Sequence, residues 1–321
     1  MSVPLVTVLM TAYNREAWIG DAIRSVLAQT FTDFELVVVD DASTDGTAAV
    51  ARAWAAADPR VRVVANERNL GQFPNRNRAA ALVQGPYFKY HDSDDVMYPH
   101  CLETMLRPLM AAPAAGFALT SARGWSGGPC PMLLTPRLCY EREFLGNGMF
   151  FGGPTCALFR TDVFRELGGF PDRGVGSDHL FWLHACARTN VLLVPGDLFW
   201  YRVHQDQEMS KPAAAREYAA LSADVWQALR TDGCPLAAPE REQARRNWAF
   251  NVVRTAGRHL RRGRVRVACM QVVLSGLSVS DWLRYLRLPR RDPLAGTPPP
   301  VEVPPVASAA GPETEQPVSP G

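Results

Sequence analysis

The chain has 321 residues, a length that suits one large or two small domains. Its hydrophobic fraction of 47% is ordinary for a globular protein, and its formal net charge is +2 at pH 7. Seven scattered cysteines without a CxxC pair argue against a zinc site or a disulfide framework and favour a reducing compartment. No basic segment precedes the first apolar run, and no apolar stretch reaches the roughly 18 residues that a membrane span requires. We therefore expect a cytoplasmic protein without a signal peptide.

Charge is distributed unevenly along the chain. Residues 1–212 carry 19 basic and 22 acidic side chains, residues 213–291 carry 15 and 6, and residues 292–321 carry 0 and 4. The last segment is rich in proline and poor in large apolar side chains, so burial cannot offset the entropy of ordering it. The sequence therefore predicts a globular domain over 1–212, a basic helical segment over 213–291 and a disordered Pro-rich tail over 292–321.

Short, largely apolar runs recur in the first hundred residues. Those at 6–10, 36–39, 61–64 and 87–90 predict strands, and the segments between the strands have helical spacing or composition. Strands that are apolar on both faces and alternate with helices indicate a mostly parallel sheet covered by helices on both sides.

Polar residues come directly after three of these strands, at 11–14, 40–41 and 92–95. Because ligands of parallel α/β sheets bind at the carboxyl ends of the strands, we expect these residues to converge on one crevice. The last group contains Asp92, Asp94 and Asp95, whose charges repel each other. A hard divalent cation such as Mg²⁺ or Mn²⁺ takes oxygen ligands and would relieve that repulsion, and the alternative is a solvated acidic turn.

The remainder of the first two hundred residues contains fewer clear signals. Helix 99–111 and strand 116–121 are predicted first, and the Gly- and Pro-rich segment 122–154 is expected to be irregular. A strand over 155–159 comes next. A helix begins near Asp178, which has the right chemistry for a helix N-cap, and two more strands precede His204.

Seven short motifs occur in a fixed order, and together they resemble a family 2 glycosyltransferase of the GT-A fold along residues 3–205. The motifs are Val8–Asn14, Gln29–Phe31, Val39–Thr47, Asn69–Gly71 with Arg76, Asp92–Asp95, Ser177–Asp178 and Tyr201–His204. The resemblance implies that 1–212 is a nucleotide-sugar-binding and catalytic domain. It also implies a nucleoside diphosphate sugar donor, most often a UDP-sugar, a bound Mn²⁺ or Mg²⁺, and transfer with inversion to an acceptor hydroxyl.

The same resemblance assigns roles to matched residues. It places nucleotide-sugar contacts at Thr11, Ala12, Tyr13, Asp41, Arg76, Asp92 and Ser93, with Asp41 accepting the imide N–H of the base. It places metal ligands at Asp94, Asp92 and His204, and the general base at Asp178. Position 177 departs from the family, because Ser177 stands where Glu is common. Simpler roles remain open for four of these residues: strand-end turn for Asp41, core packing for Tyr13, helix cap for Asp178, and for His204 a histidine on the surface or behind the metal ligands.

Two other functions are compatible with part of the sequence. Val37–Asp41 also resembles the acidic pocket of a receiver-like signalling module, but the chain has only Lys89 and Lys211 to supply the lysine that such a pocket needs. A non-catalytic nucleotide-binding protein is a further alternative. The acceptor is expected to be a saccharide or lipid-linked molecule in bacterial surface polysaccharide or glycolipid synthesis. The basic segment 241–291 is either a solvated helical face or a peripheral contact with the inner face of a membrane, and nucleic acid is not expected.

Overall fold

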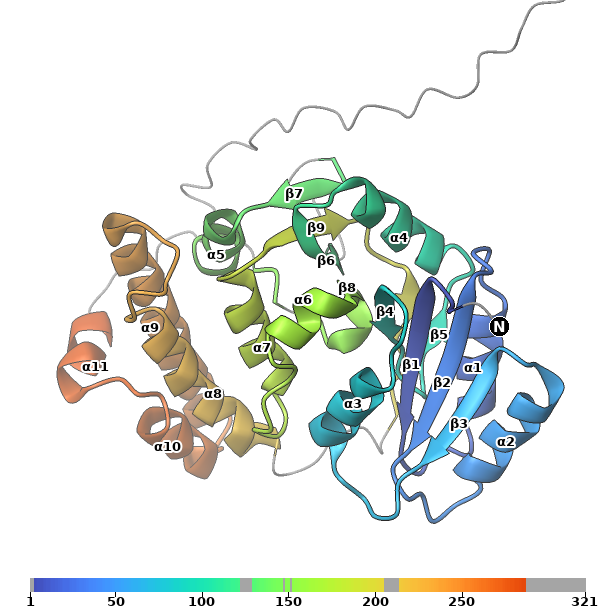
Figure 1. Ribbon diagram of the computed structural model, residues 1–321. Helices are drawn as coiled ribbons and strands as arrows, with labels where there is room; N and C mark the ends of the chain where they lie inside the picture. Colours follow the sequence, from blue (N-terminus) through green and yellow to red (C-terminus); the bar gives the residue numbers. More distant parts are fainter. Residues whose placement is uncertain (1–2, 122–128, 147, 151, 205–213, 287–321) are drawn as a thin grey trace, which may run out of the picture.

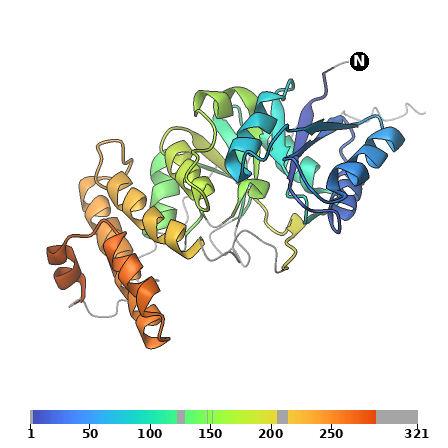
Figure 2. The same cartoon turned by 90° about the horizontal axis from the view of Figure 1, so that it is seen from below.

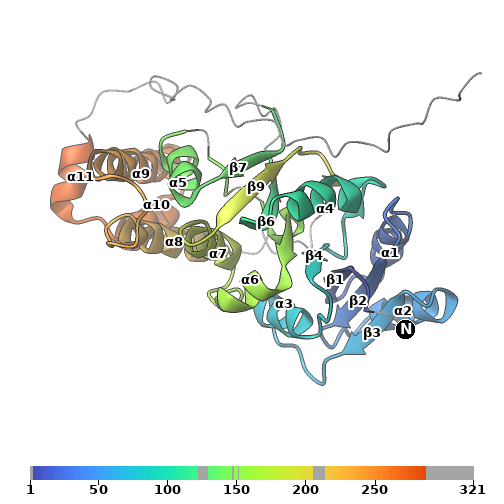
Figure 3. The same ribbon diagram turned by 45° about the horizontal axis from the view of Figure 1, so that its top comes forward.

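The computed structural model describes residues 3–121, 129–146, 148–150, 152–204 and 214–286 (Figure 1). An eight-stranded sheet runs through the molecule, helices cover both of its faces, and a further group of helices forms one end (Figures 1 and 3). The predicted α/β sheet flanked by helices is confirmed, and so is the helical C-terminal segment. The predicted disordered tail, 292–321, lies outside the described residues.

The strands of the main sheet lie in the order β3-β2-β1-β4-β8-β6-β9-β7. Their bounds are β1 Val6–Ala12, β2 Phe34–Asp40, β3 Val61–Ala65, β4 Tyr87–Tyr90, β6 Ala115–Thr120, β7 Met132–Leu134, β8 Ala157–Arg160 and β9 Asn190–Val194. Among the described strands, parallel pairs join β1 with β2 and β4, β2 with β3, and β6 with β9, and the antiparallel pairs of this sheet all involve β7 or β8. The short strands β5 (Val96–Met97) and β10 (Phe199–Trp200) form a separate antiparallel pair.

The order of the strands reverses at β1. The chain leaves β1 toward β2 and β3 on one side and returns to β4 on the other, so β1 lies between β2 and β4. Ala12 is level with Asp40 of β2, and the N–H of His91, just past β4, donates to the Leu9 carbonyl at 2.9 Å. The ends of these three strands therefore meet at a topological switch point, where open α/β sheets bind their ligands.

Alternate residues of each strand face opposite layers of the protein. Val8 of β1 and Val38 of β2 pack on one side, and Leu9 and Val37 pack on the other. The first side is covered by α1 Ile19–Leu27, α2 Thr47–Ala57 and α4 Cys101–Ala111. The second side is covered by α3 Gln72–Ala81, α5 Pro136–Phe144, α6 Thr161–Glu166 and α7 Ser177–Cys186. Burial on both faces explains why these strands are apolar at successive positions.

The prediction of irregular structure over 122–154 is wrong for much of its described part. This segment contains β7 and α5, and Pro154 begins a 3₁₀ turn that ends at Cys156. Pro136 occupies the first turn of α5, where its missing N–H costs nothing, and the Thr135 hydroxyl accepts from the Leu138 N–H at 3.4 Å. The predicted strand over 155–159 accordingly starts later, at Ala157.

The C-terminal helices extend from the end of the molecule opposite to β1–β3 (Figures 1 and 2). They are α8 Ala214–Ala228, α9 Ala238–Arg261, α10 Val265–Val273 and α11 Val279–Leu286. Leu221 and Val225 of α8 belong to the same buried cluster as Phe181 and Trp182 of α7. The helices are therefore packed onto the sheet domain. Across the described ranges, no helix combines the length and apolar character that crossing a membrane would require.

Candidate active site

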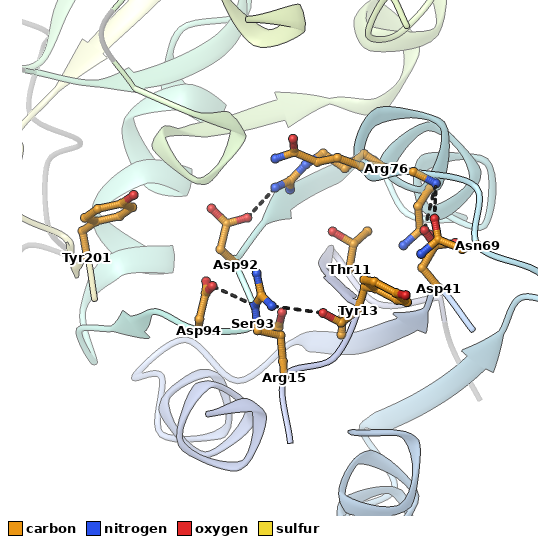
Figure 4. A pocket seen from close by; sticks show the side chains of 14 residues that line it. Thr11, Tyr13, Arg15, Asp41, Asn69, Arg76, Asp92, Ser93, Asp94 and Tyr201 are labelled. Carbon is orange, nitrogen blue, oxygen red and sulfur yellow. Dashed lines mark hydrogen bonds and ion pairs between the residues drawn. The ribbon is translucent and has the colours of Figure 1, made fainter. Parts of the chain in front are cut away.

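A crevice of about 330 Å³ opens at the switch point, a size typical of small-molecule sites (Figure 4). Every residue to which the sequence assigns a nucleotide-sugar contact lines this crevice: Thr11, Ala12, Tyr13, Asp41, Arg76, Asp92 and Ser93. Asp94 also lines it, whereas His204 and Asp178 do not. Tyr13 is 42% exposed, so it is not a core residue and its ring is available to a ligand.

Asp41 organises the wall of the crevice next to Tyr13. One carboxylate oxygen accepts from the Asn66 amide at 2.6 Å and from the Leu70 N–H at 2.9 Å, and the other accepts from the Gly71 N–H at 3.0 Å. Gly71 has φ +90° and ψ 165°, a conformation that is essentially limited to glycine. The sequence suggested a turn residue or a base contact for Asp41, and the structure shows that Asp41 fixes the Asn-Leu-Gly loop while it lines the crevice.

Buried Arg76 and half-buried Asp92 form an ion pair that also lines the crevice. Arg76, from α3, donates to the Asp92 carboxylate at 2.6 Å, and its guanidinium lies 5.6 Å from the centre of the Tyr90 ring. Burial by itself would raise the pKa of Asp92, but the charge and hydrogen bond of Arg76 outweigh it and hold that pKa below its ordinary value. Within the described structure the Nε and Nη1 groups of Arg76 have no hydrogen-bond partner. The pair is therefore a fixed, polar element of the crevice with donor capacity to spare.

Asp94 lies at the centre of a second charged group. Its Oδ2 atom accepts from Arg15 Nε at 2.9 Å and lies 3.0 Å from His204 Nε2. The His204 ring stacks on Trp18 with a centroid distance of 4.0 Å, which fixes the imidazole against the carboxylate. Tyr201, from the same segment as His204, closes this side of the crevice (Figure 4).

The chemistry of this group suits a hard divalent cation. Asp94 supplies carboxylate oxygen and His204 supplies imidazole nitrogen, and such ions complete their coordination with water and substrate phosphates rather than with a full protein cage. In the described ranges, no three His, Cys, Asp or Glu side chains are arranged to enclose a metal ion. Asp92, the other predicted carboxylate ligand, is paired with Arg76.

Asp95 has a structural role next to this group. Burial, and then the charge of Asp92, raise the pKa of the Asp95 carboxyl to about 8. Its Oδ1 atom accepts from the Arg202 N–H at 3.0 Å, and the Arg202 Nε donates to the Asp94 carbonyl at 2.9 Å. These bonds attach the segment before His204 to the Asp92–Asp95 turn, although more than one hundred residues separate the two in sequence.

Asp178 lies in the first turn of α7 but does not cap that helix. The N-cap residue is Gly176, in the left-handed conformation at φ 102°, and no side chain caps the helix. One Asp178 oxygen accepts from the His179 N–H at 2.8 Å, and the other lies 3.7 Å from the point where a Cβ of Gly153 would be. Burial raises the pKa of Asp178 above its ordinary value, so the carboxylate is a stronger base than an exposed aspartate.

The loop before Asp178 is held by the C-terminal helices. Glu217 of α8 accepts from the Val175 N–H at 2.5 Å, and Asp224 of α8 pairs with Arg173 at 3.2 Å. A Cβ on Gly176 would lie 3.4 Å from Leu221, so α8 packs directly under the start of α7. This support was not predicted, because it joins segments that the sequence gives no reason to pair.

Arg15 and Trp18 were also absent from the predicted site. Arg15 directly follows the Val8–Asn14 motif, so its position after a strand end is the one local signal that it belongs to the crevice. Trp18 immediately precedes α1 and packs on His204. Lys89, which a receiver-like pocket would need at a strand end, is fully buried inside β4 and donates to the Thr155 carbonyl.

The mixed α/β sheet with its polar crevice at the switch point matches the fold of solved GT-A-type glycosyltransferases. TarS 1-349 of S. aureus has this structure in common with the chain, with a TM-score of 0.60 and 19% identity, over 88% of this chain and 81% of TarS 1-349. The mannosyltransferase PcManGT of Pyrobaculum calidifontis, solved in complex with GDP-Man and Mn²⁺, gives 0.57 and 19% over 89% of this chain and 88% of its own. These similarities concern the fold.

The model of glycosyl transferase family 2 matches residues 7–168, just over half of the chain, and the chain belongs to this family. The putative teichuronic acid biosynthesis glycosyltransferase TuaG of Bacillus subtilis is 37% identical over 125 residues, which cover 38% of this chain and 50% of TuaG. The putative colanic acid biosynthesis glycosyl transferase WcaA of Escherichia coli is 31% identical over 157 residues, 46% of this chain and 56% of WcaA. The chain thus spans about half the length of these two relatives.

Proposed function

We propose that the protein transfers a sugar, with inversion, from a nucleoside diphosphate donor to the hydroxyl of a saccharide or lipid-linked acceptor in bacterial surface polysaccharide or glycolipid synthesis. The crevice at the switch point carries this proposal, because it gathers the residues that match the donor site of the family. TarS has been solved with UDP-GlcNAc and with UDP, which supports a UDP-sugar donor. The relatives named above, for teichuronic and colanic acid biosynthesis, support the class of product.

The donor would lie across the crevice with its base beside Tyr13 and the loop that Asp41 holds. The exposed ring of Tyr13 offers a stacking surface, and the loop offers polar groups for the base. The Arg76–Asp92 pair would contact the ribose and the start of the sugar. This arrangement leaves the Asp94 side of the crevice for the diphosphate.

Asp94 and His204 would hold a Mn²⁺ or Mg²⁺ ion at that end. The ion, when bound, would offset the negative charge that the diphosphate gains as it leaves. Arg15 and His204 contact the same Asp94 oxygen, and Arg15 lines the crevice, so its guanidinium would also contact the diphosphate. Both side chains would therefore orient the leaving group at this end of the crevice.

Asp178 would act as the general base on the acceptor side. It would take the proton from the acceptor hydroxyl as the oxygen attacks the anomeric carbon, while the bond from that carbon to the diphosphate oxygen breaks on the opposite face. Its raised pKa favours proton removal, and it lies outside the residues that line the crevice. Glu217 and Asp224 of α8 hold the loop that precedes Asp178 in place.

A thermal-shift panel tests the donor site directly. The protein is heated with UDP, TDP, GDP or CDP, each with and without Mn²⁺, since a ligand that binds only the folded state raises the apparent stability. We expect one nucleotide, UDP, to give the largest increase in melting temperature, and Mn²⁺ to enlarge it. The absence of a shift with every nucleotide would reject the donor site and favour a non-catalytic module.

A further inference from the structure

The end of α9 and the start of α10 form an exposed basic and aliphatic surface, which we call the basic tip and define as residues 258–266. Leu260 and Val265 are 54% and 56% exposed. The arginines between and around them, Arg258, Arg261, Arg262, Arg264 and Arg266, are exposed as well. Figures 1 and 3 place α9, α10 and α11 together at the end of the molecule away from β1–β3. Val272 and Val273 of α10 and Val279 and Leu283 of α11 add further exposed aliphatic side chains to this end.

Within the described residues, no ion pair neutralises the arginines of the basic tip. No Asp or Glu occurs between Glu242 and Asp281 in the sequence. Glu242 pairs with Arg245, Arg246 and Arg284, all outside the basic tip. Glu240 pairs with Arg137 of α5. The acidic side chains on α9 are thus already occupied within the described structure.

Helix stability explains only some of these arginines. Arg258 and Arg261 lie in the last turn of α9, where positive charge complements the helix dipole. Arg264 and Arg266 lie at the N-terminus of α10, where the dipole disfavours positive charge. The charges of Arg264 and Arg266 are thus unfavourable for α10, so these two arginines serve a purpose other than helix stability.

We propose that the basic tip binds the surface of a membrane rich in anionic lipid. Arginine attracts anionic headgroups, and aliphatic side chains beside it enter the boundary between headgroups and acyl chains. Proteins that bind single-stranded nucleic acid instead combine basic grooves with exposed aromatic rings. The large exposed apolar side chains that the structure describes from 258 onward are all aliphatic, which favours the lipid surface.

The position of the basic tip suits an enzyme with a membrane-bound acceptor. α9 and α10 pack on α8, and α8 holds the loop before Asp178 through Glu217. Contact between the basic tip and a membrane would therefore fix the acceptor side of the candidate site relative to the lipid surface. The binding itself requires no sugar donor, so it stands or falls separately from the proposed transferase activity.

Vesicle co-sedimentation with the full-length protein tests this inference. The probe is phosphatidylcholine vesicles with or without phosphatidylglycerol, at low and high salt, in the absence of nucleotide. We expect binding only to the phosphatidylglycerol vesicles, and weaker binding at high salt because salt screens the arginines. An arginine near an anionic surface contributes about 1 kcal/mol, which is roughly a fivefold change in partitioning. The triple variant Arg262→Gln, Arg264→Gln, Arg266→Gln should therefore partition on the order of 100-fold more weakly.

A matched control separates local binding from net charge. The triple variant Arg52→Gln, Arg107→Gln, Arg188→Gln removes the same charge from exposed positions outside the C-terminal helices and should bind like the wild type. The double variant Leu260→Ser, Val265→Ser should lose the part of the binding that persists at high salt. All three variants should keep the wild-type melting temperature, because the changed side chains are exposed.

Three results would overturn the inference. The first is no binding of the wild-type protein to anionic vesicles, which includes the case in which another segment of the chain covers the basic tip. The second is an equal loss of vesicle binding in the two triple variants, which would show that binding depends on net charge alone. The third is tighter binding to a single-stranded oligonucleotide than to vesicles, unaffected by Leu260→Ser, Val265→Ser, which would assign the surface to nucleic acid.

Discussion

Replacing Asp178 with Asn is the sharpest test of the proposed chemistry. Asn has nearly the same shape and keeps an oxygen that can accept the His179 N–H, which Asp178 accepts at 2.8 Å. It cannot take a proton from an acceptor hydroxyl. Loss of a general base typically lowers the rate by 10²–10⁴-fold, which corresponds to about 3–5 kcal/mol of transition-state stabilisation. We expect a loss of transfer within that range.

The same substitution should leave the fold and the donor site intact. Because burial raises the pKa of Asp178 in the folded protein, the ionised carboxylate costs stability as the pH rises from the unfolded pKa through the folded one. Asn removes this cost, so the variant should be at least as stable as the wild type near pH 7. Asp178 does not line the crevice, so nucleotide affinity should also be unchanged.

The assay combines single-turnover transfer with calorimetric titration of nucleoside diphosphate. Retained nucleotide affinity with transfer reduced at least about 100-fold would support the base assignment. Full transfer activity in Asp178→Asn would refute it, and equal losses of affinity and transfer would show that Asp178 supports the crevice instead. Asp172→Asn, on the exposed loop before α7, is the matched control and should behave like the wild type.

Three further predictions concern the donor side, the loop and the pH profile. Asp94→Asn should abolish the Mn²⁺-dependent part of the nucleotide thermal shift, because the amide is a poor metal ligand, and an unchanged shift would place the ion elsewhere. Gly71→Ala should cost about 1–3 kcal/mol in urea unfolding and weaken nucleotide binding, because φ +90° is strained for alanine even though nothing lies near its Cβ. Its control, Gly257→Ala inside α9, should be neutral or stabilising by up to about 1 kcal/mol. The acidic limb of kcat/KM should lie above the ordinary aspartate pKa and reflect ionisation of Asp178, so a limb at the ordinary value would contradict the burial argument.

Some of the site follows from local sequence patterns. Parallel strands that are buried on both faces must be apolar, and their polar successors must lie at one edge of the sheet. For that reason the residues after β1, β2 and β4 could be placed in one crevice before any contact was known. Where each side chain lies within that crevice could not be predicted from these local patterns.

Other features could be interpreted in two ways from the sequence, because one residue type has several structural uses. Proline suggested irregular structure around 136, but at the first turn of a helix it is favourable, and α5 begins there. For Asp178 the sequence allowed two roles, general base and helix N-cap, and Gly176 takes the N-cap position, which leaves the carboxylate available. In both cases the local composition allowed two conformations, and tertiary packing selected one of them.

The sequence by itself determined the α/β class, the order of strands and helices from β1 to β4, and the gathering of Thr11–Tyr13, Asp41 and Asp92–Asp95 at one edge. Only the tertiary structure decided which charges meet. Arg15 reaches Asp94 across 79 residues and His204 reaches it across 110, and Glu217 holds the loop before Asp178 from a different helical segment. The reason is physical: strand and helix periodicity is encoded locally, whereas an ion pair depends on the folded path of the whole chain.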